Sequence, residues 1–253
     1  MLILFVMGRV INFVSNDNCW RECVFDLSKE LSKKRKVCVF DLGYGMNQII
    51  YLFSPLPRVD LREYLVGDKN QKEVLNKVVK NLFVVKTSSV FFDYKKYNLE
   101  IKDLIRKISF EFDYIFLVGV VGEYEMLDFR NLLSNEIFII IDNTIESVMF
   151  AKNILKKCWR FENLKNKKII LNNYKVIKEI KGEMLSKDKV EEVLKIEVLF
   201  IKSKLPCGKG NVNKIKKLLC VAIENNSTII LNYEKKFRGV VGFFRRRFYE
   251  KFE

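Results

Sequence analysis

Residues 10–41 read "VINFVSNDNCWRECVFDLSKELSKKRKVCVFD", and their pattern is the strongest indication of the fold class. It opens and closes with continuous apolar runs, "VINFV" and "VCVFD", which are rich in β-branched and aromatic residues. Such runs are typical of strands that are buried on both faces. The apolar residues that recur at helical spacing between the two runs are Val24, Leu27 and Leu31. The stretch therefore predicts a strand, a loop, a helix and a second, parallel strand.

The same alternation continues along the chain. Further strand-like runs are "LFVVK" (82–86), "YIFLV" (114–118), "IFIII" (137–141), "IILN" (169–172) and "VLFI" (198–201). Helical apolar spacing recurs at 98–108, 146–157 and 189–195. This order predicts an α/β fold, a doubly wound and mostly parallel sheet with helices on both faces, over residues 1–236. A ligand site in such a fold lies at the carboxyl ends of the strands.

The amino-acid composition limits which partners and which catalytic or metal-binding groups the chain can use. The net charge of +15 favours anionic partners, either a membrane surface or nucleic acid. Histidine is absent, which removes the commonest general base and the commonest metal ligand. The six cysteines include no C-x-x-C pair and are expected to be free thiols in a reducing cytosol. We therefore expect no metal and no cofactor.

The C-terminal segment 237–253, "FRGVVGFFRRRFYEKFE", combines aromatic and basic residues. On a helix, its apolar residues share one arc that basic side chains flank. This pattern predicts an interfacial membrane helix, and the alternative is a helix docked on the protein's own core. The predicted membrane-binding residues are Val240, Val241, Phe243, Phe244, Arg245, Arg246, Arg247, Phe248 and Phe252.

The junction after the first strand is where many nucleotide-binding proteins carry a phosphate loop. Such a loop needs glycines, a lysine and a Mg²⁺-binding Ser or Thr. Here "SNDNCWREC" contains none of the glycines, although the strand and helix that frame it are present.

The chain resembles the MinD/ParA-type deviant Walker ATPases, most closely the MinD branch. Residues 11–45 can be laid on that family's strand, SGKGGVGKTT loop, helix and "KVLLIDLDxG" strand. "FDYIFLVGVVG" (112–122) resembles the family's "FDYIIIDSPAG", and "GEMLSKDKVEEVLKIEVLFI" (182–201) resembles "GDMLSxEDVxEILxIxLLGVI". The resemblance covers nearly the whole chain and implies a P-loop NTPase fold of the SIMIBI type, ending in an amphipathic helix.

Carried over position by position, the resemblance implies that the nucleotide site has degenerated. Asn16, Asn18, Cys19 and Arg21 occupy glycine positions of the loop. Asp17 stands at the signature lysine, Glu22 at the phosphate-loop lysine and Cys23 at the Mg²⁺-binding threonine. We expect Asp17, Trp20 and Glu22 to fill or seal the former phosphate pocket.

The other motifs of the family agree with this interpretation. Asp41 keeps the first acidic residue of its motif, but Gly43 replaces the second. Val118 replaces the acidic residue that helps to hold Mg²⁺, whereas Asn172 keeps the side chain used on the adenine edge. Because nucleotide-binding residues are replaced in several separate motifs, the resemblance implies that the chain keeps the family's fold but does not hydrolyse ATP.

The leading hypothesis is a MinD-like pseudo-ATPase that neither binds nor hydrolyses ATP. It would lie in the cytoplasm, peripherally at the inner face of the cell membrane, and position division, flagellar, pilus or sporulation machinery. It would act as a homodimer or with an active MinD/ParA-type ATPase. One alternative is a ParA-like nucleic-acid-binding module. Another is an enzyme with a rearranged metal site at Asp41, Asp142 and Glu146, although the last two fit a helix start better.

Overall fold

The fold is a single eight-stranded sheet with helices on both faces, seen in a computed structural model. The structure describes residues 7–15, 20–42, 49–54, 56–87, 92–119, 130–131, 133–162, 166–174, 178–179, 182–203, 217, 219–221 and 223–225. The strands lie in the order β3-β4-β2-β5-β1-β6-β7-β8, and all neighbouring pairs are parallel except β3 and β4. Their bounds are Arg9–Ser15 (β1), Val37–Asp41 (β2), Asn76–Val79 (β3), Leu82–Lys86 (β4), Tyr114–Val118 (β5), Glu136–Ile141 (β6), Asn166–Tyr174 (β7) and Val198–Ser203 (β8).

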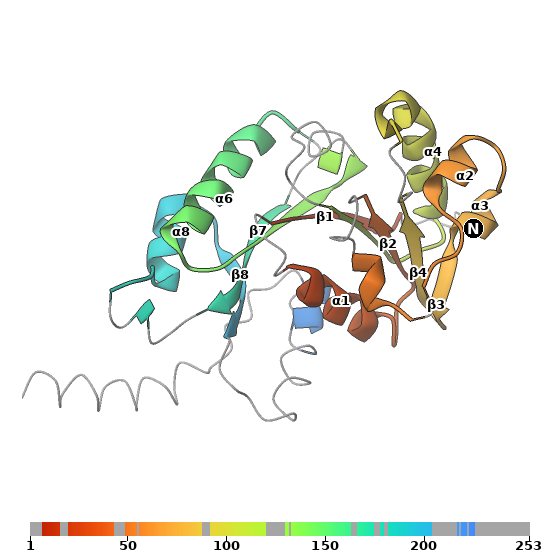
Figure 1. Ribbon diagram of the computed structural model, residues 1–253. Helices are drawn as coiled ribbons and strands as arrows, with labels where there is room; N and C mark the ends of the chain where they lie inside the picture. The colour runs from red at the N-terminus through yellow and green to blue at the C-terminus, as the bar shows by residue number, and fades with distance from the viewer. Residues whose placement is uncertain are drawn as a thin grey trace, which may run out of the picture.

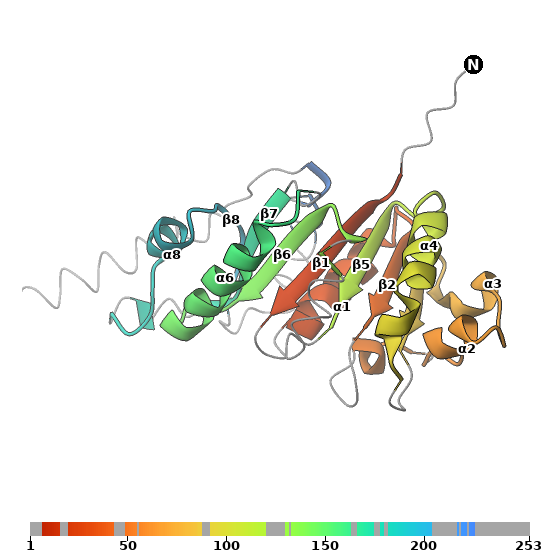
Figure 2. The same cartoon turned by 90° about the horizontal axis from the view of Figure 1, so that it is seen from above.

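Helices cover the two faces of this sheet. The bounds are Trp20–Leu31 (α1), Leu61–Leu65 (α2), Gln71–Val74 (α3), Asn98–Ile108 (α4), Ile145–Cys158 (α6) and Lys187–Leu194 (α8), with 3₁₀ turns at Ile49–Leu52 (η2) and Tyr94–Tyr97 (η3). Helices α4, α6 and α8 lie on one face, and α1 and η2 lie on the other (Figure 1). Figure 2 shows the strands side by side behind α4, α6 and α8. The predicted doubly wound, mostly parallel α/β fold is confirmed.

Buried apolar side chains hold the layers together. Every residue of β5 and β6 is buried, as expected for strands covered on both faces. The ring of Phe13 meets those of Phe116 and Phe138 edge-on, with centroids 4.9 and 5.5 Å away. The predicted apolar face of α1 is buried. The equivalent face of α4 is buried at Ile101, Leu104, Ile105 and Ile108.

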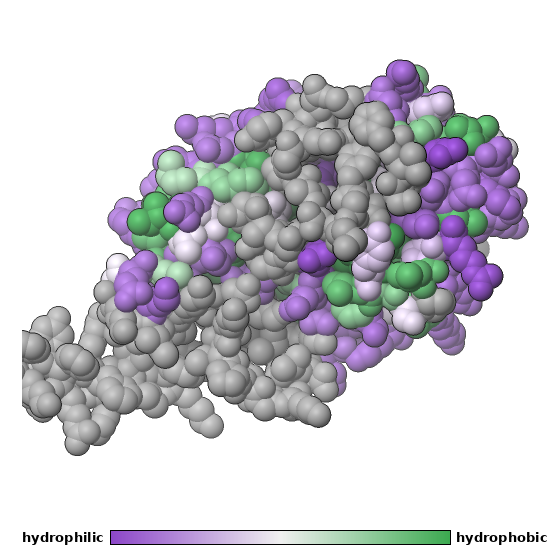
Figure 3. All heavy atoms as spheres, viewed as in Figure 1, coloured by the Kyte–Doolittle hydropathy of each residue, from purple (hydrophilic) through white to green (hydrophobic). Residues whose placement is uncertain are grey.

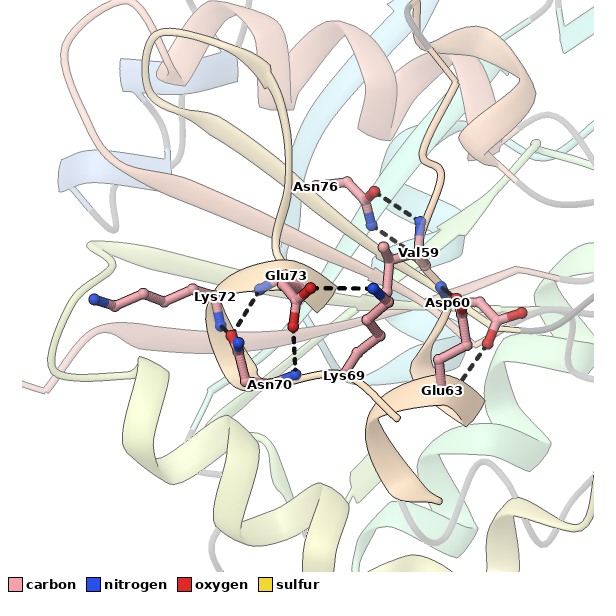
Figure 4. A network of polar contacts seen from close by, with 8 residues as sticks. All are labelled: Val59, Asp60, Glu63, Lys69, Asn70, Lys72, Glu73 and Asn76. Atoms are coloured by element: carbon pink, nitrogen blue, oxygen red, sulfur yellow. Dashed lines mark hydrogen bonds and ion pairs between the residues drawn. The ribbon is translucent and has the colours of Figure 1, made fainter. Parts of the chain in front are cut away.

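The sequence analysis did not predict α2, α3 or β3. The two helices are too short to show a periodic apolar face, and each begins with a capping box (Figure 4). The backbone N–H of Glu63 donates to the Asp60 carboxylate (3.1 Å), and the N–H of Asp60 donates to Glu63 (2.8 Å). Asn70 and Glu73 make the same reciprocal pair. These caps, rather than apolar spacing, define both helices.

The described residues from 217 to 225 are helical and pack on the α1 face of the sheet. Leu219, Cys220 and Ile223 are buried in the same cluster as Leu27. The predicted boundary between residues 1–236 and 237–253, and all the predicted membrane-binding residues, lie outside the described residues. None of the helices within the described ranges is both long enough and apolar enough to span a membrane.

Candidate functional site

The carboxyl edge of the sheet brings the ends of β1, β2 and β5 together. In the register of these strands, Asp41 lies beside Val118, and β1 follows on the other side of β5. The loop that links β1 to α1 begins at this edge, so the predicted degenerate nucleotide site lies where a doubly wound sheet places its ligands. Asn16, Asp17, Asn18, Cys19 and Gly43 lie outside the described residues.

Asp41 is buried at the end of β2, with none of its surface exposed. Its carboxylate oxygen Oδ2 accepts a hydrogen bond from the backbone N–H of Ile50 at 3.1 Å. Its carbonyl oxygen accepts a second one from the N–H of Thr87, also at 3.1 Å. The acidic residue that the motif retains is therefore bonded to the chain itself and ties η2 to the strand end.

Arg130 is a second charged residue at this edge, and it is only 1% exposed. Its Nη1 atom donates to the carbonyl of Gly119, 3.1 Å away, whereas Nε and Nη2 have no hydrogen-bond partner among the described residues. Burial lowers the pKa of the guanidinium to about 10, and the charge of Asp41 opposes that shift. A buried cation therefore lies within electrostatic reach of the Asp41 carboxylate.

The sequence analysis missed Arg130. Its signal was weak, because a single arginine in "FRNLLSNE" reads as an ordinary surface residue. Gly119 shows how closely the arginine packs: a Cβ added there would lie 3.0 Å from Nη1 of Arg130 and 3.2 Å from the backbone of Leu42. The arginine thus packs directly against the backbone that follows β5.

Val118 and Cys23, at two positions that bind Mg²⁺ in the resemblance, face the protein interior. Val118 is completely buried and Cys23 is 2% exposed, and both belong to the core cluster on the α1 face. Neither side chain offers an oxygen ligand to a cation. These positions contribute to packing.

The first turn of α1 places its charged residues outside the core. Arg21 is half-buried and Glu22 is exposed. A carboxylate near a helix N-terminus is stabilised there by the amide dipoles while it remains solvated. Glu22 therefore lies in solvent at the helix start, and its part in sealing the former phosphate pocket stays a prediction. Asp17 and the side chain of Trp20 lie outside the described residues.

The start of α6 uses Asp142 and Thr144 as a cap. The carboxylate of Asp142 accepts hydrogen bonds from the N–H of Thr144 (3.1 Å) and from its hydroxyl (2.6 Å). The Thr144 hydroxyl accepts one from the N–H of Ser147 at 3.3 Å, and Glu146 is exposed. This arrangement is the helix start that the sequence favoured over a metal site. Within the described ranges, no group of three potential metal ligands occurs.

Asn172 lies at the carboxyl end of β7 and is 2% exposed. Leu171 pairs with Ile141 of β6, so Asn172 stands at the same edge as Asp142.

Two areas of the described surface are apolar. Apolar side chains gather over η2 and over α6 in Figure 3, where Tyr51, Leu52, Ile145 and Met149 are exposed.

The parallel sheet, its strand order and a strand–loop–helix junction at the carboxyl edge define the P-loop NTPase type of fold. The chain is 22% identical to the septum site-determining protein MinD of Thermotoga maritima over 214 residues, 82% of this chain and 77% of that protein. MinD in the MinC:MinD cell division complex of Aquifex aeolicus superposes with a TM-score of 0.66 at 18% identity, over 87% of this chain and 89% of that one. A ParA family ATPase of Chlorobium tepidum superposes with a TM-score of 0.61 at 21% identity, over 85% and 93%.

In sequence and in fold, the chain resembles the MinD/ParA-type proteins, as its motifs predicted. No protein-family profile matches it. The sequence identities are low, and the structural matches establish the fold. The named relatives act in septum placement and cell division or belong to the ParA family ATPases.

Proposed function

We propose that this chain is a MinD-like pseudo-ATPase, which does not bind ATP and serves as a positioning or scaffold protein at an anionic membrane surface. The observation that carries the proposal is the burial of the Asp41 carboxylate and its contacts within the protein. Its carboxylate is buried, accepts the Ile50 N–H and lies within electrostatic reach of the buried Arg130. A carboxylate engaged in this way is part of the protein's own structure.

The neighbouring positions support the loss of nucleotide binding. Val118 and Cys23 are in the core, so neither provides the oxygen ligand that Mg²⁺ prefers. Glu22 places a negative charge where an ATP-binding relative has a lysine, and Asp17 does the same in the sequence. Two unit charges 4 Å apart interact by about 1 kcal/mol in water and about 4 kcal/mol near a protein surface. The carboxylates at these two positions therefore repel the phosphates of ATP, whereas lysines there would attract them.

The membrane part of the proposal rests on residues 237–253. Their apolar arc and the three arginines beside it fit a helix that lies in the membrane interface. One short helix of this kind binds reversibly, because each basic residue near an anionic surface contributes about 1 kcal/mol. Two copies in a dimer, or one copy paired with an active relative, would bind more tightly. The machinery that this protein positions would then gather at the membrane.

Vesicle binding tests the membrane part. The full chain should sediment with anionic vesicles, and Phe244→Asp with Phe248→Asp should release it. A matched control is Leu56→Asp with Leu99→Asp, which introduces the same charge at side chains that are 54% and 79% exposed in the described fold. Equal sedimentation of the tail variant and the control would contradict membrane binding through this segment.

A ParA-like nucleic-acid-binding module is the second candidate. The net charge of +15 favours it, because cations that neutralise phosphates release counterions and give strongly salt-dependent binding. Retention on non-specific duplex DNA that weakens steeply with salt, together with no vesicle binding, would favour this function. Under the membrane proposal, the chain should instead bind anionic vesicles more tightly than duplex DNA.

A further inference from the structure

The amino edge of the sheet, opposite the candidate site, gathers two basic runs. Helices α1 and α6 both end at this edge, and β2 and β7 both begin there. Residues 29–36 hold one carboxylate and five cations, Lys29, Lys33, Lys34, Arg35 and Lys36. Residues 156–168 hold one carboxylate and six cations, Lys156, Lys157, Arg160, Lys165, Lys167 and Lys168.

Hydrogen bonds between the strand starts place these runs along one edge. The carbonyl of Lys36 accepts from the N–H of Asp113 at 2.9 Å, and the carbonyl of Asp113 accepts from the N–H of Arg9 at 2.9 Å. The N–H of Asn135 donates to the carbonyl of Val10, also at 2.9 Å. Glu136 then pairs with Asn166 at the start of β7. The two basic runs are therefore brought to the same side of the molecule.

The cations of this edge are largely solvent-facing. Lys33 and Arg35 are 62% and 53% exposed in their side chains, and Lys34 and Lys156 are exposed too. Surface ion pairs join Lys33 to Glu30, Arg35 to Glu224 and Lys36 to Glu111, and so involve three of the five cations in residues 29–36. Cations in the last turns of helices also complement the helix dipoles. An excess of positive charge nevertheless remains at this edge.

Exposed aromatic side chains accompany these cations. Trp159 is 77% exposed directly after α6, between Lys157 and Arg160. Phe110 is 50% exposed directly after α4, near Lys107. Tryptophan beside basic residues is favoured at membrane–water interfaces, because the ring is apolar and its N–H stays hydrated.

Residues 223 and 224, near the end of the described part of the chain, also lie at this edge. The guanidinium of Arg9 donates to the carbonyl of Ile223, and Nε of Arg35 lies 3.4 Å from the carboxylate of Glu224. The blue turns of this segment lie beside the strand starts in Figure 2.

We propose that the amino edge of the sheet faces an anionic membrane, where the two basic runs contact lipid headgroups and Trp159 enters the interface. This inference rests on the proposed membrane function and adds a second contact with an orientation. The carboxyl edge, with the degenerate site, then faces away from the membrane toward partners. The exposed ring of Trp159 among these cations favours a membrane over nucleic acid as the occupant, because tryptophan is favoured at membrane–water interfaces.

Charge reversal in the full chain tests this orientation. Lys34→Glu with Lys156→Glu should lower partitioning onto phosphatidylglycerol-containing vesicles at least tenfold, because each cation near such a surface is worth about fivefold. The matched control is Lys96→Glu with Lys189→Glu, which carries the same charge change near the starts of α4 and α8, at the opposite edge. The control should bind within about twofold of the parent chain. Thermal unfolding of all variants checks that the fold is unchanged.

Tryptophan fluorescence gives an independent readout. The chain has two tryptophans, and addition of anionic vesicles should shift the emission to shorter wavelength. Trp159→Phe should remove most of that shift. An equal shift in the parent chain and this variant would contradict insertion of Trp159.

The outcomes separate the two proposals. If Phe244→Asp with Phe248→Asp releases the chain but Lys34→Glu with Lys156→Glu does not, the amino-edge inference fails and the membrane function stands. If only the amino-edge variant releases it, the inference stands and the tail is not the anchor. If the amino-edge variant loses duplex DNA retention and keeps vesicle binding, the edge is a nucleic-acid surface and the inference is overturned.

Discussion

The carboxylate of Asp41 accepts a hydrogen bond from the backbone N–H of Ile50, with 3.1 Å between the oxygen and the nitrogen. This bond joins the end of β2 to η2 and is completely buried on the Asp41 side. Asp41 is therefore expected to contribute to the stability of the fold.

Asp41→Ala should destabilise the fold by about 3–5 kcal/mol, because it leaves the buried cation of Arg130 without its compensating charge. Denaturant unfolding followed by circular dichroism measures the change. Asp68→Ala removes an exposed carboxylate and should stay within about 0.5 kcal/mol of the parent chain. An equally small effect at Asp41 would show that the carboxylate has no structural role.

Coupling between the two buried charges is the next prediction. Arg130→Met replaces the guanidinium by an apolar side chain and removes its desolvation cost. In a double-mutant cycle, Asp41→Ala should therefore cost at least about 1 kcal/mol less in the Arg130→Met background than in the parent chain. Additive effects would mean that Asp41 and Arg130 do not interact.

The capping box of α3 should make stability depend on acid pH. The N–H of Asn70 and the ammonium of Lys69 both lower the pKa of Glu73, the former more strongly. Because the folded pKa lies below the ordinary value of 4.5, this contribution is full above 4.5 and is lost as the pH falls through the folded pKa. Glu73→Ala should destabilise the protein at pH 7, and the difference should shrink below about pH 4. A difference that stays constant with pH would contradict this assignment.

Arg9 and Glu136 form a bidentate pair at the opposite edge, with contacts of 2.6 and 2.7 Å. Glu136 is 4% exposed, so Glu136→Ala should cost about 3 kcal/mol or more by leaving the arginine unpaired. Because Arg9 also donates to the carbonyl of Ile223, residues 219–225 should lose hydrogen-exchange protection in this variant. Glu162→Ala, at an exposed site, is the control.

The buried thiols should react slowly. Cys23, Cys38, Cys158 and Cys220 are buried thiols. Burial raises the pKa of the Cys38 thiol, and it raises that of Cys220 to about 12, so little thiolate forms at neutral pH. Native protein should label with Ellman's reagent at these four positions only at the rate of unfolding. Rapid labelling of Cys38 would contradict its placement in the core.

The periodic elements could be predicted from sequence, and the short ones could not. The runs at 37–41, 82–86 and 114–118 match β2, β4 and β5 residue for residue, because strands that are wholly or mostly buried are nearly continuous apolar runs. Helix α4 likewise matches 98–108. Helices α2 and α3 span about one turn each and depend on caps, and β3 is an antiparallel edge strand with alternating burial.

The candidate site could be predicted in its location but not in its internal contacts. The apolar runs placed Asp41 and Val118 at the ends of predicted strands, and the register of β2 and β5 shows that the two residues lie side by side. The burial of Arg130 depends on long-range packing against Gly119 and on the charge of Asp41, which lies 89 positions earlier in the chain. The exposure of Glu22 could not be predicted, because a helix N-terminus keeps a carboxylate solvated as readily as a pocket encloses it.

Isothermal titration of the full chain with ATP, in the presence and absence of Mg²⁺, is the decisive test of whether the nucleotide site is lost. We expect no Mg²⁺-dependent binding up to millimolar ATP, under buffer conditions in which the protein is folded and binds anionic vesicles. Saturable, Mg²⁺-dependent binding with a micromolar Kd would contradict the loss of nucleotide binding.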